Sequence, residues 1–204
     1  MEDQLSVTIR DEYAKIVDLL QRMAADKAME ETIRQVVVLC TQALAKGNKL
    51  MFAGNGGSAA DAQHWAGELV SRFNFDRPGL AAIALTTDTS ILTAIGNDYG
   101  YDYVFARQVE ALGQAGDVLF AISTSGNSKN IVRAIDAART KGLKVVGFTG
   151  QGGGAMAALC DVCFRVPSPE TPRIQEGHEA LGHLICALIE QEIFGQEKTG
   201  DAGH

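Results

Sequence analysis

The sequence of 204 residues lacks an excess of positive charge and has no long apolar run. It carries 18 lysines and arginines against 25 aspartates and glutamates, a net charge of −7, which argues against nucleic-acid binding and against binding to an anionic membrane surface. No apolar stretch approaches the roughly 18 residues that cross a bilayer. The beginning of the sequence has no basic region followed by an apolar one, so we expect no signal peptide and a cytoplasmic protein.

Cysteine is also scarce, and the spacing of the four cysteines does not match that of a zinc ribbon. Cys160 and Cys163 form a C-x-x-C pair, but a second pair, which a zinc ribbon needs, is missing. Cys40 and Cys186 lie in apolar helical patterns, where a cysteine usually acts as a small core residue. We interpret the four cysteines as structural and leave a redox or metal role of the C-x-x-C pair as the less favoured alternative.

What the chain does have is a regular alternation of short apolar runs and helical patterns. The apolar runs are 50–53, 81–85, 118–122, 145–148 and 162–166, and the helical patterns between them are 59–72, 89–97, 102–112, 129–141 and 153–160. This alternation predicts an α/β fold with a parallel sheet covered on both faces. We expect a single domain over 1–195, made of two helices within 5–47, an α/β core at 48–170, a helix at 174–194, and then a frayed polar tail at 196–204.

A glycine-rich turn, Gly54-Asn55-Gly56-Gly57-Ser58, follows the first predicted strand and opens into a helix. Such a turn presents backbone N–H groups at the positive end of a helix dipole, where a phosphate or a sugar oxygen binds readily. The turn has neither the G-x-G-x-x-G order of a dinucleotide fold nor a Walker lysine. His64 and Glu68 follow at i, i+4 on one helix face. The pattern indicates a phosphosugar site with acid–base or metal chemistry.

A second turn, Ser123-Thr124-Ser125-Gly126-Asn127-Ser128, follows the third predicted strand and precedes another helix. Ser123, Thr124, Ser125 and Ser128 offer hydroxyl donors at a helix N-terminus, which suits a phosphate group. The alternative is an ordinary capping turn with Ser128 as the N-cap. A cap needs one hydroxyl, so we favour phosphate binding.

Two further groups of polar residues are candidates. Asn97 and Asp98, in a predicted loop at 94–99, either line the sugar hydroxyls or form a plain turn, and the residue types do not decide between these. On the last helix Gln175, Glu179 and His183 share a face because they are spaced i, i+4, i+8. Zinc accepts a mixed nitrogen and oxygen set, and the set that we predict as its ligands is His64, Glu68, Gln175 and His183. Gln175 is the weakest of these because amides are poor zinc ligands. The alternative is that the same residues bond the sugar without a metal.

These residues resemble the SIS (sugar isomerase) domain family, and within it the phosphoheptose isomerases. The resemblance covers nearly the whole chain as far as Phe194, and its specific parts are 54–64, 97–98, 123–128 and 173–178. It implies a flavodoxin-like three-layer sandwich with a five-stranded parallel sheet, and a homotetramer with active sites at subunit interfaces. It also implies zinc on the residues matching our ligand set. Spare apolar faces on the terminal helices agree with packing between subunits.

The implied reaction is conversion of sedoheptulose 7-phosphate to D-glycero-D-manno-heptose 7-phosphate, the first step of a heptose branch of surface-glycan synthesis. Moving a proton between C1 and C2 needs a base, for which we predict Glu68, with His183 shuttling protons to the oxygens. We expect Asn55, Gly56, Gly57, Ser58 and Gln175 to bind the substrate together with Asn97, Asp98 and the serine turn. The alternative is a related non-catalytic SIS protein that binds the bacterial replication initiator. Proteins of that type lack the acid matching Glu68 and the histidine matching His183, and this chain has both.

Overall fold

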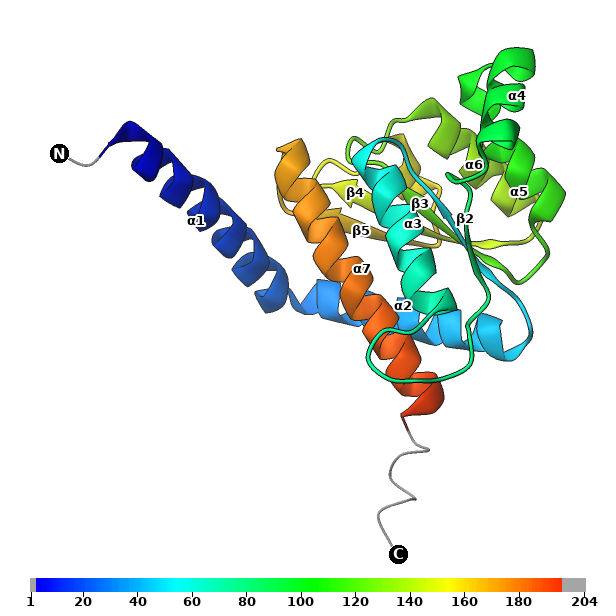
Figure 1. The fold of residues 1–204 in the computed structure, drawn as a ribbon, viewed down its shortest axis with the longest axis horizontal. Helices are drawn as coiled ribbons and strands as arrows, with labels where there is room; N and C mark the ends of the chain where they lie inside the picture. The colour runs from blue at the N-terminus through cyan, green and yellow to red at the C-terminus, as the bar shows by residue number, and fades with distance from the viewer. Residues whose placement is uncertain (1–2, 196–204) are drawn as a thin grey trace, which may run out of the picture.

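Five short strands form one parallel sheet in the computed structural model, which describes residues 3–195 (Figure 1). Their spatial order is β2-β1-β3-β4-β5, the order of flavodoxin-like folds, which confirms the predicted fold class. The strands are β1 Leu50–Ala53, β2 Ala82–Ala84, β3 Val118–Ile122, β4 Lys144–Gly150 and β5 Val162–Val166.

The predicted strands differ from the observed ones at β2 and β4 only. β2 is one residue shorter at each end than the run 81–85, and it is an edge strand with one pairing partner. β4 extends beyond the run 145–148 at both ends because it lies between two strands. Its added residues Lys144, Thr149 and Gly150 pair through their backbones with β3 or β5, whatever the polarity of their side chains. The carboxyl ends of β1, β3 and β4 therefore form one edge, above which the two predicted turns lie.

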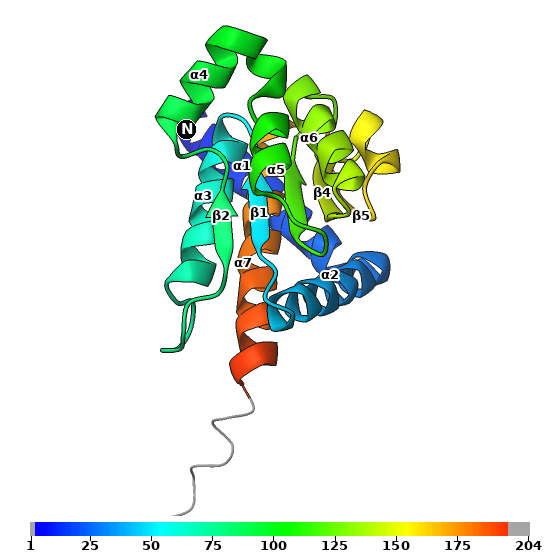
Figure 2. The ribbon, with the colours of Figure 1, turned by 90° about the vertical axis from the view of Figure 1, so that its right-hand side faces the viewer.

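Helices cover both faces of the sheet (Figure 2). One face is packed by α2, α3 and α7, which contribute Cys40, Trp65 and Ile185 to one apolar core. The other is packed by α5 and α6, which contribute Val109 and Ile131 to a second core. The helices are α1 Gln4–Ala25, α2 Lys27–Ala45, α3 Gly57–Val70, α4 Thr89–Tyr99, α5 Ala106–Leu112, α6 Lys129–Thr140 and α7 Thr171–Phe194, with short 3-10 segments η1 Tyr101–Tyr103 and η2 Ala155–Ala158.

Three helix predictions need correction. The pattern 102–112 is divided into η1, which ends at Tyr103, and α5, which begins only at Ala106 after a turn at Val104 and Phe105. The pattern 153–160 forms only the 3-10 turn η2, because Gly153 and Gly154 both have positive φ. α7 begins at Thr171, earlier than the predicted residue 174, with a proline in its first turn, where the missing N–H costs nothing. The predicted tail at 196–204 lies outside the described residues.

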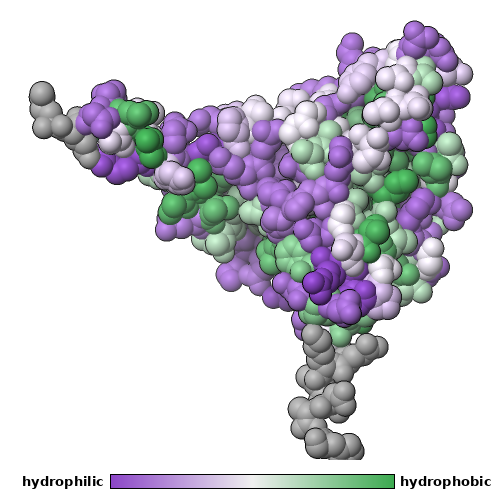
Figure 3. All heavy atoms as spheres, viewed as in Figure 1, coloured by the Kyte–Doolittle hydropathy of each residue, from purple (hydrophilic) through white to green (hydrophobic). Residues whose placement is uncertain are grey.

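α1 extends away from the rest of the chain (Figure 1). Only Leu19 and Met23 of this helix are buried, and hydrophobic residues are exposed along it (Figure 3). Asp26 separates α1 from α2 and caps α2 through its carboxylate, which accepts from the backbone N–H groups of Ala28 and Met29. No helix within 3–195 is long and apolar enough to cross a membrane.

Candidate functional site

The candidate site lies where α3 and α7 run side by side (Figure 1). The two helices approach closely at Gly182, where a Cβ atom would overlap the indole ring of Trp65. The Trp65 Nε1–H group also donates a 3.0 Å hydrogen bond to Glu179 Oε2. Because these contacts fix the spacing and rotation of the helices, the polar residues on their facing sides meet.

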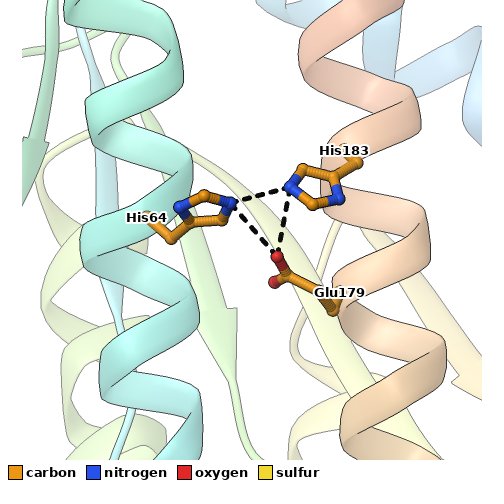
Figure 4. Close-up of side chains that lie close together, drawn as sticks. All are labelled: His64, Glu179 and His183. Atoms are coloured by element: carbon orange, nitrogen blue, oxygen red, sulfur yellow. Dashed lines mark hydrogen bonds and ion pairs between the residues drawn. The ribbon is translucent and has the colours of Figure 1, made fainter.

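Three of these polar residues converge on one point (Figure 4). The Nε2 atoms of His64 and His183 lie 2.7 Å apart. Glu179 Oε1 lies 3.3 Å from the His64 Nε2 atom and 3.2 Å from the His183 Nε2 atom. All three donor atoms are within 4.8 Å of one another. Two imidazole nitrogens and a carboxylate oxygen are the donor set of many zinc sites, so this cluster fits a zinc ion.

Of the two remaining residues of the predicted zinc set, Glu68 lies beside this cluster and Gln175 lies against the start of α3. Glu68 Oε1 is 3.6 Å from His64 Nε2, one helical turn along α3, and outside the group of three converging atoms. Gln175 lies one turn before Glu179, with its amide packed against Gly57 at the start of α3. The structure thus brings His64 and His183 together, with Glu179 as the carboxylate between them. The i, i+4 spacing places Glu179 on the same face of α7 as His183, but its hydrogen bond with Trp65 is seen only in the structure.

Two more residues at this site were missed by the sequence analysis. Asp61, one turn before His64, has a buried Oδ2 atom without a hydrogen-bond partner among residues 3–195. Burial raises the pKa of this carboxyl to about 6, the Glu179 carboxylate adds to the rise, and His64 opposes it. Arg72 lines an open cavity of about 590 Å³ together with His64 and Glu68. Asp61 lies within the stretch 54–64 that carries the family resemblance, but it was given no role there, and Arg72 belongs to no motif.

His178 has a separate, structural position. It is fully buried, and its Nε2–H group donates a 3.1 Å hydrogen bond to the carbonyl oxygen of Thr149 at the end of β4. Burial lowers the pKa of the imidazole to about 4, so it is neutral at ordinary pH. His178 therefore ties α7 to the sheet on the side away from His183.

The serine turn lies between β3 and α6, as predicted. Ser128 is at the N-cap position of α6, but its hydroxyl makes no capping bond and lies 2.9 Å from Ser123 Oγ. Ser125 Oγ lies 3.5 Å from the same Ser123 oxygen and accepts a 3.2 Å bond from the Asn127 N–H group. Gly126 turns the chain with a φ of 68°. Because the hydroxyls group together rather than cap the helix, the alternative of a plain capping turn loses its main support.

The glycine turn at the start of α3 is joined to the serine turn. Asn55 and Asn130, in the first turn of α6, exchange amide hydrogen bonds of 2.9 and 2.8 Å. The Tyr101 hydroxyl donates a further 3.1 Å bond to Asn55 Oδ1. Gly56 is at the N-cap position of α3 with a φ of 56°, and no side chain caps this helix. Two helix N-termini thus lie close together at one edge of the sheet, which suits a ligand that carries a phosphate and hydroxyl groups.

Asn97 and Asp98 are not in a loop, as the sequence analysis expected. They form the end of α4, which is capped at its start by the Asp88 side chain. Both are exposed, and Asn97 Nδ2 donates a 2.8 Å bond to Asp98 Oδ1. The stretch 94–99 continues an apolar helical pattern, and Gly100 ends it. Their part in sugar binding stays a prediction.

Comparison with known proteins gives consistent matches. A family model described as SIS domain matches residues 12–150. The phosphoheptose isomerase of Burkholderia pseudomallei is 56% identical over 197 residues, which are 97% of this chain and the whole of that protein. The solved phosphoheptose isomerase of Neisseria gonorrhoeae is 46% identical with a TM-score of 0.86, over 92% of this chain and the whole of that one. That of Francisella tularensis is 37% identical with a TM-score of 0.88, over 93% and 100%.

Proposed function

This chain belongs to the SIS domain family and is an aldose–ketose isomerase of its phosphoheptose isomerase branch, and we propose that it converts sedoheptulose 7-phosphate to D-glycero-D-manno-heptose 7-phosphate. This reaction begins a heptose branch of lipopolysaccharide core or surface-glycan synthesis. The proposal includes a cytoplasmic location, which the family resemblance suggests. The observation that carries the function is the convergence of His64, Glu179 and His183 beside Glu68.

The reaction moves a proton between C1 and C2 of the open-chain sugar through an enediol. In the proposed mechanism Glu68 removes and returns that proton, because it faces the open cavity and its carboxylate lies outside the group of three converging atoms. His183 exchanges protons with the sugar oxygens. The serine turn binds the phosphate, and Asn55, through its ties to α6, keeps the glycine turn beside it.

The direct test is an assay of the purified wild-type chain with sedoheptulose 7-phosphate. We expect formation of the aldose product, followed by NMR or by a coupled reaction specific for the aldose. The alternative of a non-catalytic SIS protein predicts no turnover and a stable complex with the replication initiator. Absence of turnover together with such a complex would therefore replace the enzymatic proposal.

We propose zinc as the cofactor, held by His64 and His183 with oxygen ligands from Glu68, Gln175 or Glu179. Bound zinc supplies a Lewis acid that stabilises negative charge on the sugar oxygens. His64→Ala is expected to lower zinc content and activity together, as measured by elemental analysis and the isomerase assay. The control is Gln35→Ala, at an exposed position of α2 that does not line the cavity of His64 and Glu68. Full activity of rigorously zinc-free protein would leave the cluster only a hydrogen-bonding role.

The phosphate assignment predicts a change in KM. Removing two hydroxyls in Ser125→Ala/Ser128→Ala is expected to raise KM by roughly 100-fold or more, since hydrogen bonds to a charged group contribute about 1.5–3 kcal/mol each. α6 should keep its stability because Ser128 makes no capping bond. Thr32→Ala, at a half-buried position of α2 where the hydroxyl donates to the Ala28 carbonyl oxygen, is the control and should leave KM unchanged. An unchanged KM in the double variant would move the phosphate to the glycine turn.

We also propose a homotetramer with active sites at subunit interfaces. A groove of about 350 Å³ runs between α1, α2 and α7 and is lined mainly by apolar side chains. Apolar residues are also exposed along α1 and α7, and two of them, Leu20 and Leu184, line the groove. The others are Leu5, Ile9, Tyr13, Val17 and Leu188. Exposed apolar residues that gather on one surface commonly mark a contact between proteins. Light scattering should give about four times the chain mass of 21.7 kDa. A mass near that of one chain at micromolar concentration would contradict the tetramer and any shared site.

A further inference from the structure

A fully buried carboxylate on α7 lies outside the catalytic cluster. Glu190 has no solvent exposure, and both of its oxygens accept hydrogen bonds from the segment 71–80, which connects α3 to β2. Oε1 accepts from the Phe73 N–H group at 2.8 Å and from Arg77 Nε at 3.0 Å. Oε2 accepts from the Asn74 N–H group at 2.6 Å. These donors keep the pKa of Glu190 below its ordinary value despite its burial, so the carboxylate is charged.

Arg77 joins the same segment to the end of α3. Its side chain is 2% exposed, and its guanidinium donates to several backbone carbonyl oxygens as well as to Glu190. Nη1 donates to Leu69 O at 2.6 Å and Nη2 donates to Glu68 O at 2.9 Å. Carbonyl oxygens in the last turn of a helix have no hydrogen-bond donor within the helix, so the Arg77 guanidinium supplies donors to them from the following segment. The last turn of α3, which carries Glu68, is thereby held against α7.

The segment held in this way reaches the catalytic cluster. The ring of Phe73 lies 5.6 Å from the His183 imidazole, centroid to centroid, at an interplanar angle of 50°. Arg72, the residue before it, lines the cavity that contains His64 and Glu68. The buried pair therefore connects, through one segment, the proposed base on α3 with the histidine on α7.

We propose that Glu190 and Arg77 are positioning residues of the isomerase, which fix Phe73 against His183 and fix the turn of α3 that carries Glu68. This inference rests on the proposed function. A buried ion pair is a weak source of net stability, since desolvation of both charges offsets their attraction. Here almost all of the remaining hydrogen bonds go to backbone groups at the end of α3 and in the segment 71–80. The pair therefore specifies geometry at the site more than it adds stability.

The principal test variant is Glu190→Gln, which keeps the shape of the side chain. The glutamine amide has one accepting oxygen and one NH₂ group in place of the two accepting oxygens of the carboxylate. The NH₂ group faces an N–H donor of the segment 71–80 and cannot accept a hydrogen bond from it, so the segment loses one of its attachments to α7. We expect kcat to fall by about 10- to 100-fold, the range found when supporting residues let a site loosen. KM for the phosphosugar should change by less than about threefold, because the serine turn binds the phosphate independently. Glu192→Gln, an exposed position two residues along α7, is the matched control.

Two readouts that do not depend on activity accompany the kinetics. Hydrogen exchange at the Phe73 and Asn74 amides should quicken in Glu190→Gln, since these N–H groups lose their acceptor. The side-chain NMR signals of His183 should shift in the same direction in Glu190→Gln as in Phe73→Leu, because the first displaces the Phe73 ring from His183 and the second removes it. Phe73→Leu keeps an apolar side chain over His183, so it should retain more kcat than Phe73→Ala. Arg77→Lys, which keeps the charge but loses the forked donors, should repeat the effect of Glu190→Gln.

The outcomes separate this inference from the proposed function. If Glu190→Gln and Arg77→Lys only lower the melting temperature, while kcat per folded molecule and the His183 signals stay at wild-type values, the positioning role is wrong. If the wild-type chain does not isomerise the sugar, the proposed function fails. Amide exchange and the His183 signals then still decide whether the pair holds Phe73 in place. Loss of kcat with matching changes in both NMR readouts supports the inference.

Discussion

Glu68→Gln is expected to lose nearly all turnover, with a fall in kcat of about 10²- to 10⁴-fold, the usual contribution of a general base. The substitution removes the proton acceptor but almost no volume. Glu68 is partly exposed and makes its side-chain contact with His64, so the fold and phosphosugar binding should persist. The measurement is a comparison of kcat and of substrate binding, by calorimetry, between the variant and the wild type.

Glu179→Gln is the informative partner of this variant, because it distinguishes a base from a metal ligand. Glu179 lies between His64 and His183, whereas Glu68 touches the cluster from one side. We expect Glu179→Gln to lower zinc content, and Glu68→Gln to lower kcat with less effect on zinc. Turnover near the wild-type rate in Glu68→Gln would move the role of base to another carboxylate, either Glu179, which lies between the histidines, or Asp61, which interacts electrostatically with His64.

The sheet and its turns were predictable because local signals specify them. Short apolar runs bounded by turn residues marked the strands, and three of the five were predicted to the residue. The glycine turn and the serine turn each follow a strand and precede a helix, so their meeting at one edge of the sheet follows from parallel topology alone. Local signals failed at Asn97 and Asp98, where polar residues indicated a turn but the apolar pattern around them continued as α4.

The parts that could not be predicted depend on contacts between distant segments. Glu179 and His64 meet only because α3 and α7 pack against each other, and the Glu190 bond to the Phe73 amide spans 117 positions of sequence. The segment 71–80 has no helical or strand period, and a buried carboxylate on an apolar helix looks in the sequence like an exposed one. The sequence patterns therefore identified the two histidines and placed Glu179 on the correct face of its helix, but they did not place its carboxylate between the histidines or indicate the buried Glu190–Arg77 pair.

The close approach of α3 and α7 predicts the largest effect on stability. Gly182→Ala places a Cβ atom inside the ring of Trp65, which is itself buried and hydrogen-bonded to Glu179, so neither partner can move easily. Overpacking of this kind costs about 1–3 kcal/mol, and the overlap with a fixed ring places Gly182→Ala at the upper end, about 3 kcal/mol. Because His183 follows Gly182, any separation of the helices that relieves the overlap also moves His183 away from His64, and activity should fall with stability.

Gly67→Ala is the matched control for this prediction. Gly67 is also a helical glycine, on α3, but a Cβ atom there meets no atom within 4 Å. Replacing an exposed helical glycine by alanine should stabilise the chain by up to about 1 kcal/mol. Urea unfolding at one protein concentration therefore should give midpoints displaced in opposite directions, with Gly182→Ala below the wild type and Gly67→Ala above it. A Gly182→Ala midpoint equal to that of the wild type would mean that α7 is free to shift along α3, and the geometry of the His64–Glu179–His183 cluster would then depend on something other than this helix contact.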